Sequence, residues 1–297
     1  MIRSLIQLSR PQQWTKNLLC LAGAVFSGRM SDPAALGAVL ATMFLFCIGS
    51  SATYIFNDIW DRDRDRKHPR KSKRPLASGR VSVSTATMLC VLLTGAALAG
   101  TWWLGIATFV CMGLFIVLNI AYTTTLKHVA LLDVMCIAMG FVLRLCGGVY
   151  VLNLLPTTWI TLCTFFLALF LGFAKRRAEL NSLTERDTEQ RPVLDKYSVA
   201  FLDELLSSAA TITIISYALF TVASGKNPSL ILSLPFVYFG VMSYKGLVTM
   251  SDVGEEPEKI VFTDSRVLVT VVLWLVSFLA IEYWDPQLFT LTTTGKG

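Results

Sequence analysis

Nine long apolar runs divide this chain and leave little room for a water-soluble fold. They cover residues roughly 12–28, 34–56, 83–101, 104–125, 129–151, 157–174, 205–223, 229–247 and 267–284. Most approach the roughly 20 residues that a helix needs to cross about 30 Å of hydrocarbon. Because a backbone in lipid must satisfy its own hydrogen bonds, the runs predict an all-α, polytopic membrane protein. We expect about nine transmembrane helices in a single domain, residues 1–297.

Lysine and arginine gather on one side of the predicted helices. If the runs alternate in direction, 22 of the 26 basic residues lie with the N-terminus and with the loops after runs two, four, six and eight. This asymmetry satisfies the positive-inside rule, so the N-terminus and these loops are expected in the cytoplasm. The formal net charge of +6 therefore suits lipid headgroups or a phosphorylated substrate. No motif supports a nucleic-acid partner.

Charge of both signs is concentrated in NDIWDRDRDRKHPRKSKRPLASG, residues 57–79, directly after the second run. If the second helix continues through this stretch, at about 100° per residue, then Asn57, Asp58, Asp61 and Asp65 share one stripe. Such a stripe could be a solvated helix face whose acids pair with the interleaved basic residues. Alternatively it is a Mg²⁺ site, since Mg²⁺ usually takes one or two carboxylates plus substrate phosphates and water. On this interpretation Asn57, Asp61 and Asp65 hold the metal, and Asp58, Asp61 and Asp65 are the catalytic acids.

Other polar residues on the predicted cytoplasmic side are candidate substrate ligands. They are Lys16, Asn17, Arg74, Tyr122, Lys127, Lys175, Arg176 and Glu179. For each, a structural role as an interfacial anchor or helix-end charge competes with phosphate binding. Arg144 lies inside the fifth run, where a charge is costly and usually has a partner. It is therefore a further substrate-binding candidate, with a structural pair as the alternative.

Two motifs in the charged stretch resemble those of the UbiA superfamily of intramembrane prenyltransferases. NDIWDRDRD (57–65) is similar to the first NDxxDxxxD motif of that superfamily, and RPLASG (74–79) is similar to the RPLxSG that follows it. The resemblance covers essentially the whole chain. It implies a UbiA-type helical bundle that binds a diphosphate through Mg²⁺ at the inner face of the membrane.

The chain departs from the superfamily pattern after the sixth run. Aromatic prenyltransferases of the superfamily carry a second DxxxD-type motif there, whereas this chain has KRRAEL (175–180). RPxQWxKN (10–17), KHPxKxxRP (67–75), KRRAEL and DKYS (195–198) together resemble the branch of decaprenyl-phosphate phosphoribosyltransferases. DKYS adds Lys196 and Tyr197 to the expected substrate ligands.

That branch implies a definite reaction. Its members transfer phosphoribose from 5-phosphoribosyl 1-diphosphate to a polyprenyl phosphate and release diphosphate, which supplies arabinose donors for mycobacterial-type cell walls. The resemblance thus predicts a bacterial plasma-membrane enzyme with a cytoplasmic active site. Two alternatives stay open: prenyl transfer to an aromatic or other acceptor, and a transporter or channel whose inner charges form an ion gate, with Asp133 and Arg144 as the main charges near the bilayer midplane. A homo-oligomer is also left open.

Overall fold

Helices account for the regular structure of the described chain. The computed structural model describes residues 2–69, 71–181, 193–250, 260, 263–284 and 288. Within them, eight helices are long and apolar enough to cross a membrane, which confirms the predicted all-α, polytopic fold. The chain forms two compact units, Met1–Pro156 and Thr157–Gly297. Each is described by itself, and the expectation of a single domain stays a prediction.

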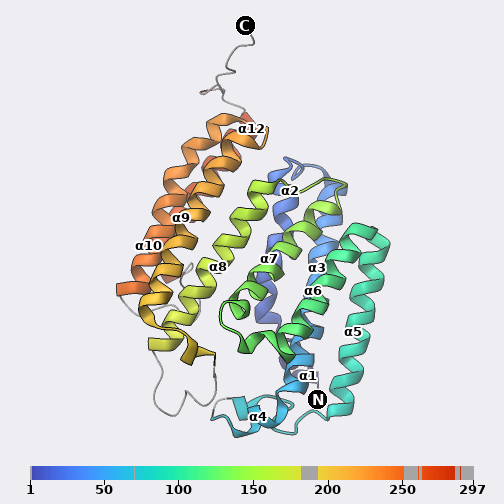
Figure 1. Cartoon of the computed structure of the whole chain (residues 1–297). Helices are drawn as coiled ribbons and strands as arrows, with labels where there is room; N and C mark the ends of the chain where they lie inside the picture. Colours follow the sequence, from blue (N-terminus) through green and yellow to red (C-terminus); the bar gives the residue numbers. More distant parts are fainter. Residues whose placement is uncertain are drawn as a thin grey trace. The chain divides into compact units, whose positions relative to one another are not determined.

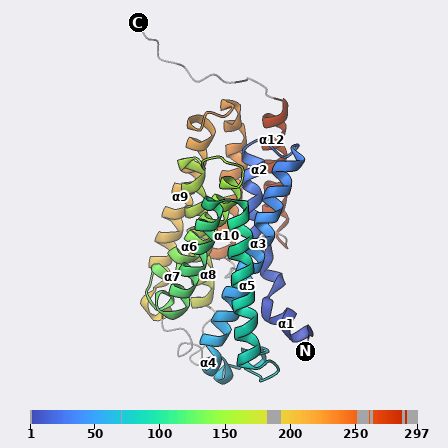
Figure 2. The ribbon, with the colours of Figure 1, turned by 90° about the vertical axis from the view of Figure 1, so that its right-hand side faces the viewer.

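Unit 1 contains four of the long helices. Its elements are α1 (Ile2–Ser9), η1 (Pro11–Leu21), α2 (Ala22–Phe26), α3 (Pro33–Trp60), α4 (Arg62–Lys67), η2 (Lys71–Lys73), α5 (Val83–Leu104), α6 (Ile106–Thr124), η3 (Leu126–His128) and α7 (Leu132–Tyr150). Asp32 caps α3 by accepting a 2.9 Å hydrogen bond from Ala34 N, and Ser82 caps α5 by accepting one of 3.1 Å from Thr85 N. The four long helices α3, α5, α6 and α7 run side by side (Figure 1 and Figure 2).

The first predicted run is not one regular membrane-spanning α-helix. It consists of the 3-10 segment η1 followed by the short α2. Glycines bring this segment into backbone contact with α7: a Cβ added to Gly148 would lie 2.1 Å from Cys20 O, and one added to Gly23 would lie 2.1 Å from Gly148 O. Small residues permit such close approach between helices in membranes. The expected count of nine helices is therefore approximate, because the first run is irregular.

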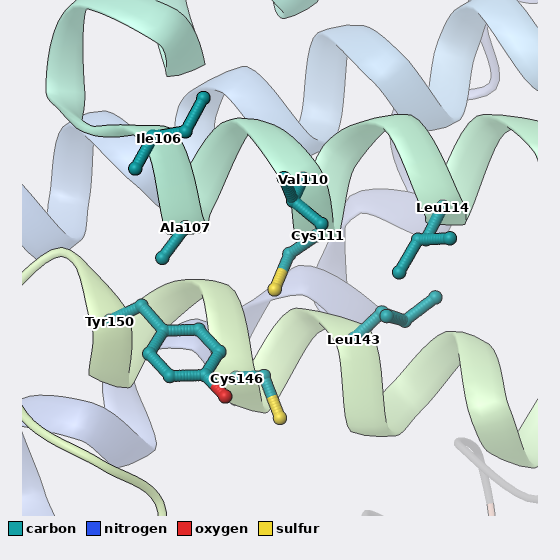
Figure 3. Close-up of a pocket in the computed structure, with 8 residues that line it drawn as sticks. All are labelled: Ile106, Ala107, Val110, Cys111, Leu114, Leu143, Cys146 and Tyr150. Carbon is teal, nitrogen blue, oxygen red and sulfur yellow. The ribbon is translucent and has the colours of Figure 1, made fainter.

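Aromatic side chains fill the centre of unit 1. Phe46 of α3 meets Phe115 of α6 edge to face, with ring centroids 5.6 Å apart. Gly147 of α7 leaves the space that the Phe46 ring occupies. At the surface, an apolar groove of about 350 Å³ runs between α6 and α7 and is lined by side chains that include Val110, Leu114 and Tyr150 (Figure 3). These residues lie on the first half of α6 and the second half of α7, and the lining is mostly apolar, so the groove suits a hydrocarbon chain.

Unit 2 contains the other four long helices. Its elements are α8 (Thr158–Asn181), η5 (Leu194–Lys196), α9 (Val199–Ala223), η6 (Pro228–Ser233), α10 (Leu234–Met250) and α12 (Ser265–Trp284). A buried network joins three of them: Tyr217 OH shares a 2.5 Å hydrogen bond with Ser233 Oγ, and Trp274 Nε1 donates to Tyr217 OH at 2.8 Å. Lys226, in the loop before η6, also forms an ion pair with Glu282 of α12.

Candidate functional site

The acidic stretch is not one continuous helix, contrary to the sequence prediction. α3 ends at Trp60 and α4 begins at Arg62, with Asp61 between them at φ −89° and ψ 5°. Two backbone hydrogen bonds still bridge the break, from Asp61 N to Asn57 O at 2.9 Å and from Asp65 N to Asp61 O at 2.8 Å. The chain keeps a nearly helical path, but the ψ of Asp61 departs from the helical value of about −42°. The acidic side chains therefore meet two separate groups of partners.

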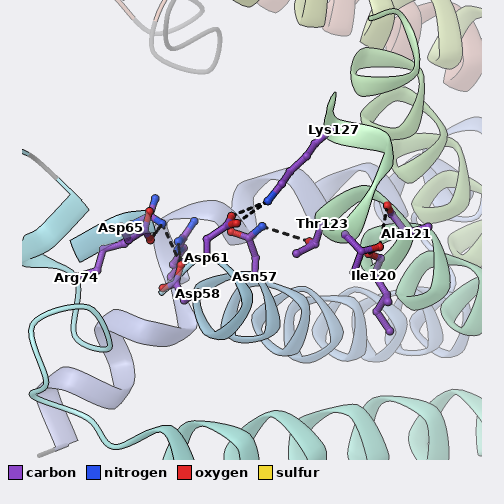
Figure 4. A network of polar contacts seen from close by, with 11 residues as sticks. Asn57, Asp58, Asp61, Asp65, Arg74, Ile120, Ala121, Thr123 and Lys127 are labelled. Carbon is purple, nitrogen blue, oxygen red and sulfur yellow. Dashed lines mark hydrogen bonds and ion pairs between the residues drawn. The ribbon is translucent and has the colours of Figure 1, made fainter. Parts of the chain in front are cut away.

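Asn57 and Asp61 face the end of α6. The amide Nδ2 of Asn57 donates to Thr123 Oγ1 at 3.2 Å. Lys127 of η3 donates from Nζ to both carboxylate oxygens of Asp61, at 2.7 and 2.8 Å (Figure 4). Two polar contacts thus tie the end of α3 to the end of α6 and to the turn that follows it.

Asp58 and Asp65 share an arginine. Arg74 donates from NH1 to Asp58 Oδ1 at 3.2 Å and to Asp65 Oδ2 at 2.5 Å (Figure 4). Arg10 forms a second ion pair with Asp58 and lies over the Tyr54 ring, 5.2 Å from its centroid. Sequence reasoning did not select Arg10. The available signal was an arginine directly before Pro11 at the entrance to the first apolar run.

The cations of this cluster come from distant parts of the sequence. Asp58 and Asp65 are only 3% and 4% exposed, which argues against a solvated helix face. Buried carboxylates require a compensating charge, and Arg10, Arg74 and Lys127 supply it from three different segments. Of the interleaved basic residues, Arg66 pairs with the exposed Asp63 on the other side of α4, at 3.7 Å. We call Asn57, Asp58, Asp61 and Asp65 together with these three cations the aspartate cluster.

The donor atoms of the aspartate cluster fit Mg²⁺ with substrate phosphates completing its shell. Because the Asn57 nitrogen is bound to Thr123, its Oδ1 points away as an acceptor with no hydrogen-bond partner in the described part of the chain. Asp61 lies one turn further with two more oxygens. Within the described residues no group of three or more His, Cys, Asp or Glu could hold an ion. One or two protein oxygens plus phosphates and water is the usual arrangement for Mg²⁺.

Asn17 and Arg144 contact each other inside unit 1. Asn17 is fully buried and Arg144 is 6% exposed. Arg144 donates from Nε to Asn17 Oδ1 at 2.7 Å and from NH1 to Gly140 O at 2.8 Å, and its guanidinium lies 4.5 Å from the Phe115 ring centroid. All of its hydrogen-bond partners in the described residues are neutral. These contacts favour the structural alternative, in which Arg144 fixes the irregular first segment to α7.

Two other candidates of unit 1 lie near its polar groups. Lys16 precedes Asn17 on η1 and is partly buried. Tyr122 occupies the last turn of α6, next to Thr123, and is also partly buried. Substrate binding by these two residues stays a prediction.

The predicted substrate ligands of unit 2 lie at the basic end of α8 and in the segment before α9. Arg176 is 1% exposed and donates from NH1 to Glu179 Oε2 at 2.8 Å, while Lys175 is partly buried beside it. In the next described segment, which begins at residue 193, Lys196 is exposed in η5. Tyr197 is buried and stacks on Phe201 with ring centroids 6.4 Å apart. The predicted ligands of this unit thus lie in the last turns of α8 and directly before the start of α9.

Arg177 has a structural role that its position in the basic run did not reveal. It donates from Nε to Asp203 Oδ1 at 2.6 Å and from NH1 to Val248 O at 2.8 Å. A third contact, from NH2 to Thr249 O at 3.4 Å, adds another carbonyl at the end of α10. This one guanidinium therefore connects α8, α9 and α10.

We expect Arg177→Met to destabilise the protein by about 2–4 kcal/mol, because it leaves buried carbonyls without donors and Asp203 without its cation. Thermal unfolding of the purified protein in detergent measures the loss. The matched control is Arg266→Met, which removes an exposed cation whose one ion pair among the described residues is with Asp264, at 3.0 Å, and should leave the melting temperature nearly unchanged. Equal melting temperatures for the two variants would contradict the structural role of Arg177.

These observations define a class of protein. The sequence model of the UbiA prenyltransferase family matches residues 17–263, and the chain belongs to that family. Its fold agrees: a UbiA homolog from Archaeoglobus fulgidus bound to DMAPP and Mg²⁺ superposes with a TM-score of 0.74 at 19% identity, covering 94% of this chain and 99% of that one. The chain is thus an integral membrane transferase, and the transporter alternative is set aside.

Several relatives that match over nearly the full chain carry the same name. The decaprenyl-phosphate phosphoribosyltransferase of Mycolicibacterium smegmatis is 30% identical, over 96% of this chain and 94% of that protein. The enzyme of the same name from Corynebacterium glutamicum is 28% identical, over 95% of this chain and 88% of its own length. The similarity to this branch of the family therefore extends over nearly the full chain, as the sequence motifs predicted.

Proposed function

We propose that this chain transfers the 5-phosphoribosyl group from 5-phosphoribosyl 1-diphosphate to a polyprenyl phosphate, with Mg²⁺, and releases diphosphate. The observation that carries this proposal is the end of α8. Where aromatic prenyltransferases have a second acidic motif, this helix presents Lys175 and the buried Arg176. A cationic helix end suits a second phosphorylated substrate better than a second metal. The relatives named decaprenyl-phosphate phosphoribosyltransferase support the same reaction.

In the aspartate cluster, Asn57 and Asp61 would hold Mg²⁺, whereas Asp65, the third metal ligand expected from the sequence, is paired with Arg74. When bound, the metal neutralises charge on the leaving diphosphate. Lys127 pairs with Asp61, and Arg74 pairs with Asp58 and Asp65, and both cations can donate to phosphate oxygens. Asp58 and Asp65 orient Arg74 through its two ion pairs. The cluster thus recognises the diphosphate half of the sugar donor.

The lipid phosphate needs little further activation, because a phosphate oxygen is already a competent nucleophile at neutral pH. The role of the protein is to bring that oxygen close to ribose C1 and in line with the leaving diphosphate. We assign binding of the remaining phosphates to Lys16 and Tyr122 in unit 1 and to Lys175, Arg176, Lys196 and Tyr197 in unit 2. Glu179 holds Arg176 by its ion pair. The excess of basic residues in these loops supports a cytoplasmic active site at a bacterial plasma membrane.

The function is tested by supplying purified protein with ribose-labelled 5-phosphoribosyl 1-diphosphate, Mg²⁺ and a polyprenyl phosphate, followed by solvent extraction. We expect labelled lipid that depends on both Mg²⁺ and the polyprenyl phosphate. A parallel reaction contains a prenyl diphosphate and an aromatic acceptor. Prenylated aromatic product together with no labelled lipid would overturn the proposal and establish the other reaction of the family.

A further inference from the structure

Lys127 occupies the two carboxylate oxygens that Asp61 would offer to a metal. Its Nζ lies 2.7 Å from Oδ1 and 2.8 Å from Oδ2, so one ammonium takes both oxygens at once. The side chains are only 14% and 20% exposed, and water screens the pair less than it would on an open surface. A cation that approaches this carboxylate therefore meets one that is already in place.

The Lys127 side chain can leave Asp61 without separating α3 from α6. Lys127 belongs to the three-residue turn η3, and its ammonium sits on a flexible four-carbon stem. The neighbouring Asn57–Thr123 hydrogen bond joins the same two helix ends independently, at 3.2 Å. Moving Lys127 away from Asp61 therefore leaves α3 and α6 connected. An oxygen of Asn57 that has no hydrogen-bond partner in the described residues stays in place beside the vacated carboxylate.

We propose that Lys127 is an internal competitor of the metal: it holds Asp61 while no diphosphate is bound and transfers to diphosphate oxygens when metal and diphosphate arrive. This inference rests on the proposed function only in that the ligand carries a diphosphate. Two consequences follow. Free divalent metal binds weakly, because it must displace an ammonium from a partly buried carboxylate. Diphosphate strengthens metal binding, because it offers the displaced ammonium a new partner, and this coupling is reciprocal.

The test is Mn²⁺ binding to the purified full-length protein, followed by the electron paramagnetic resonance signal of free Mn²⁺. Lys127→Met should bind Mn²⁺ about threefold or more tightly than wild type, as expected for the loss of one partly exposed ion pair. Lys67→Met is the matched control, because Lys67 is exposed on α4 and has no ion pair in the described residues. It removes the same charge without freeing a carboxylate, so its Mn²⁺ affinity should stay close to that of wild type. Asp61→Asn should bind more weakly than all three.

A second titration adds inorganic diphosphate at saturation. Diphosphate should raise the Mn²⁺ affinity of wild type by a larger factor than that of Lys127→Met, since only wild type gains the lysine–phosphate contact. Lys127→Arg keeps a cation on Asp61 and should bind free Mn²⁺ no more tightly than wild type. Gel filtration and thermal unfolding would reveal a folding defect in Lys127→Met. In that case Lys127→Arg still tests the same position with the charge retained.

Unchanged or weaker Mn²⁺ binding by folded Lys127→Met, or an equal effect of diphosphate on that variant and on wild type, would overturn the inference. These outcomes are independent of which group the enzyme transfers. If no phosphoribosyl lipid forms but Lys127→Met still binds Mn²⁺ more tightly, the proposed function fails and the competition stands.

Discussion

Asp61→Ala is expected to lower kcat/KM by about a hundredfold to a thousandfold while the protein remains folded. Asp61 would be the carboxylate ligand of the metal, and loss of such electrostatic stabilisation typically costs a hundredfold to a thousandfold or more. Asp65→Ala should have a comparably severe effect, because Asp65 shares Arg74 with Asp58 and fixes that guanidinium at 2.5 Å. Initial rates of lipid labelling, with gel filtration to verify folding, measure both variants.

Asp63→Ala is the matched control for these substitutions. Asp63 belongs to the same stretch, but its side chain is 86% exposed, and its one ion pair in the part of the chain that the structure describes is with Arg66, at 3.7 Å. We expect this variant to keep nearly full activity. If Asp61→Ala is as active as Asp63→Ala, the aspartate cluster is an ion-paired helix end with no part in turnover.

Gly148→Ala should cause a large loss of stability in unit 1. The added methyl group would lie 2.1 Å from Cys20 O, a backbone atom that cannot rotate away. Overpacking of a tight site typically costs about 1–3 kcal/mol, and a backbone clash places this variant at the upper end or beyond. Thermal unfolding in detergent should show a clearly lowered melting temperature or no folded protein at all.

Gly113→Ala provides the comparison, because no heavy atom lies within 4 Å of the position of its added Cβ on α6. Alanine is favoured over glycine inside a helix by about 1 kcal/mol, so this variant should be neutral or slightly more stable. Equal melting temperatures for the two variants would show that η1, α2 and α7 are not in backbone contact.

The sequence was sufficient to predict the membrane class, because apolar runs of helical length have few other folds available. It also selected Asp58, Asp61 and Asp65, since the spacing of NDxxDxxxD places acids near one another in any helix-like path. The close packing of the first segment on α7 could not be foreseen, because it depends on the fit of Gly148 against Cys20 O, about 130 residues apart in the chain. The break at Asp61 likewise could not be predicted, because no Gly or Pro stands beside it in the sequence.

The ion-pair partners of Asp58, Asp61 and Asp65 also could not be predicted from nearby sequence, because tertiary packing supplies them. Interleaved arginines suggested local ion pairs, but burial of Asp58 and Asp65 directs them to cations brought by tertiary packing. Lys127 pairs with Asp61 across 66 positions of sequence. Arg177 resembled one more basic helix-end residue until its contacts with Asp203 and with the end of α10 showed that it serves packing. Spacing reveals which residues share a helix face, whereas only packing decides what that face meets.

The most direct test of phosphoribosyl transfer follows both halves of the donor in one reaction. 5-Phosphoribosyl 1-diphosphate carrying one radiolabel in the ribose and a second in the β-phosphate would be incubated with the protein, Mg²⁺ and a polyprenyl phosphate, and both labels would be counted after solvent extraction. Cleavage at ribose C1 predicts that the ribose label enters the lipid phase while the β-phosphate label remains in water as diphosphate. Both labels in the lipid, or neither, would contradict transfer of phosphoribose by this chain.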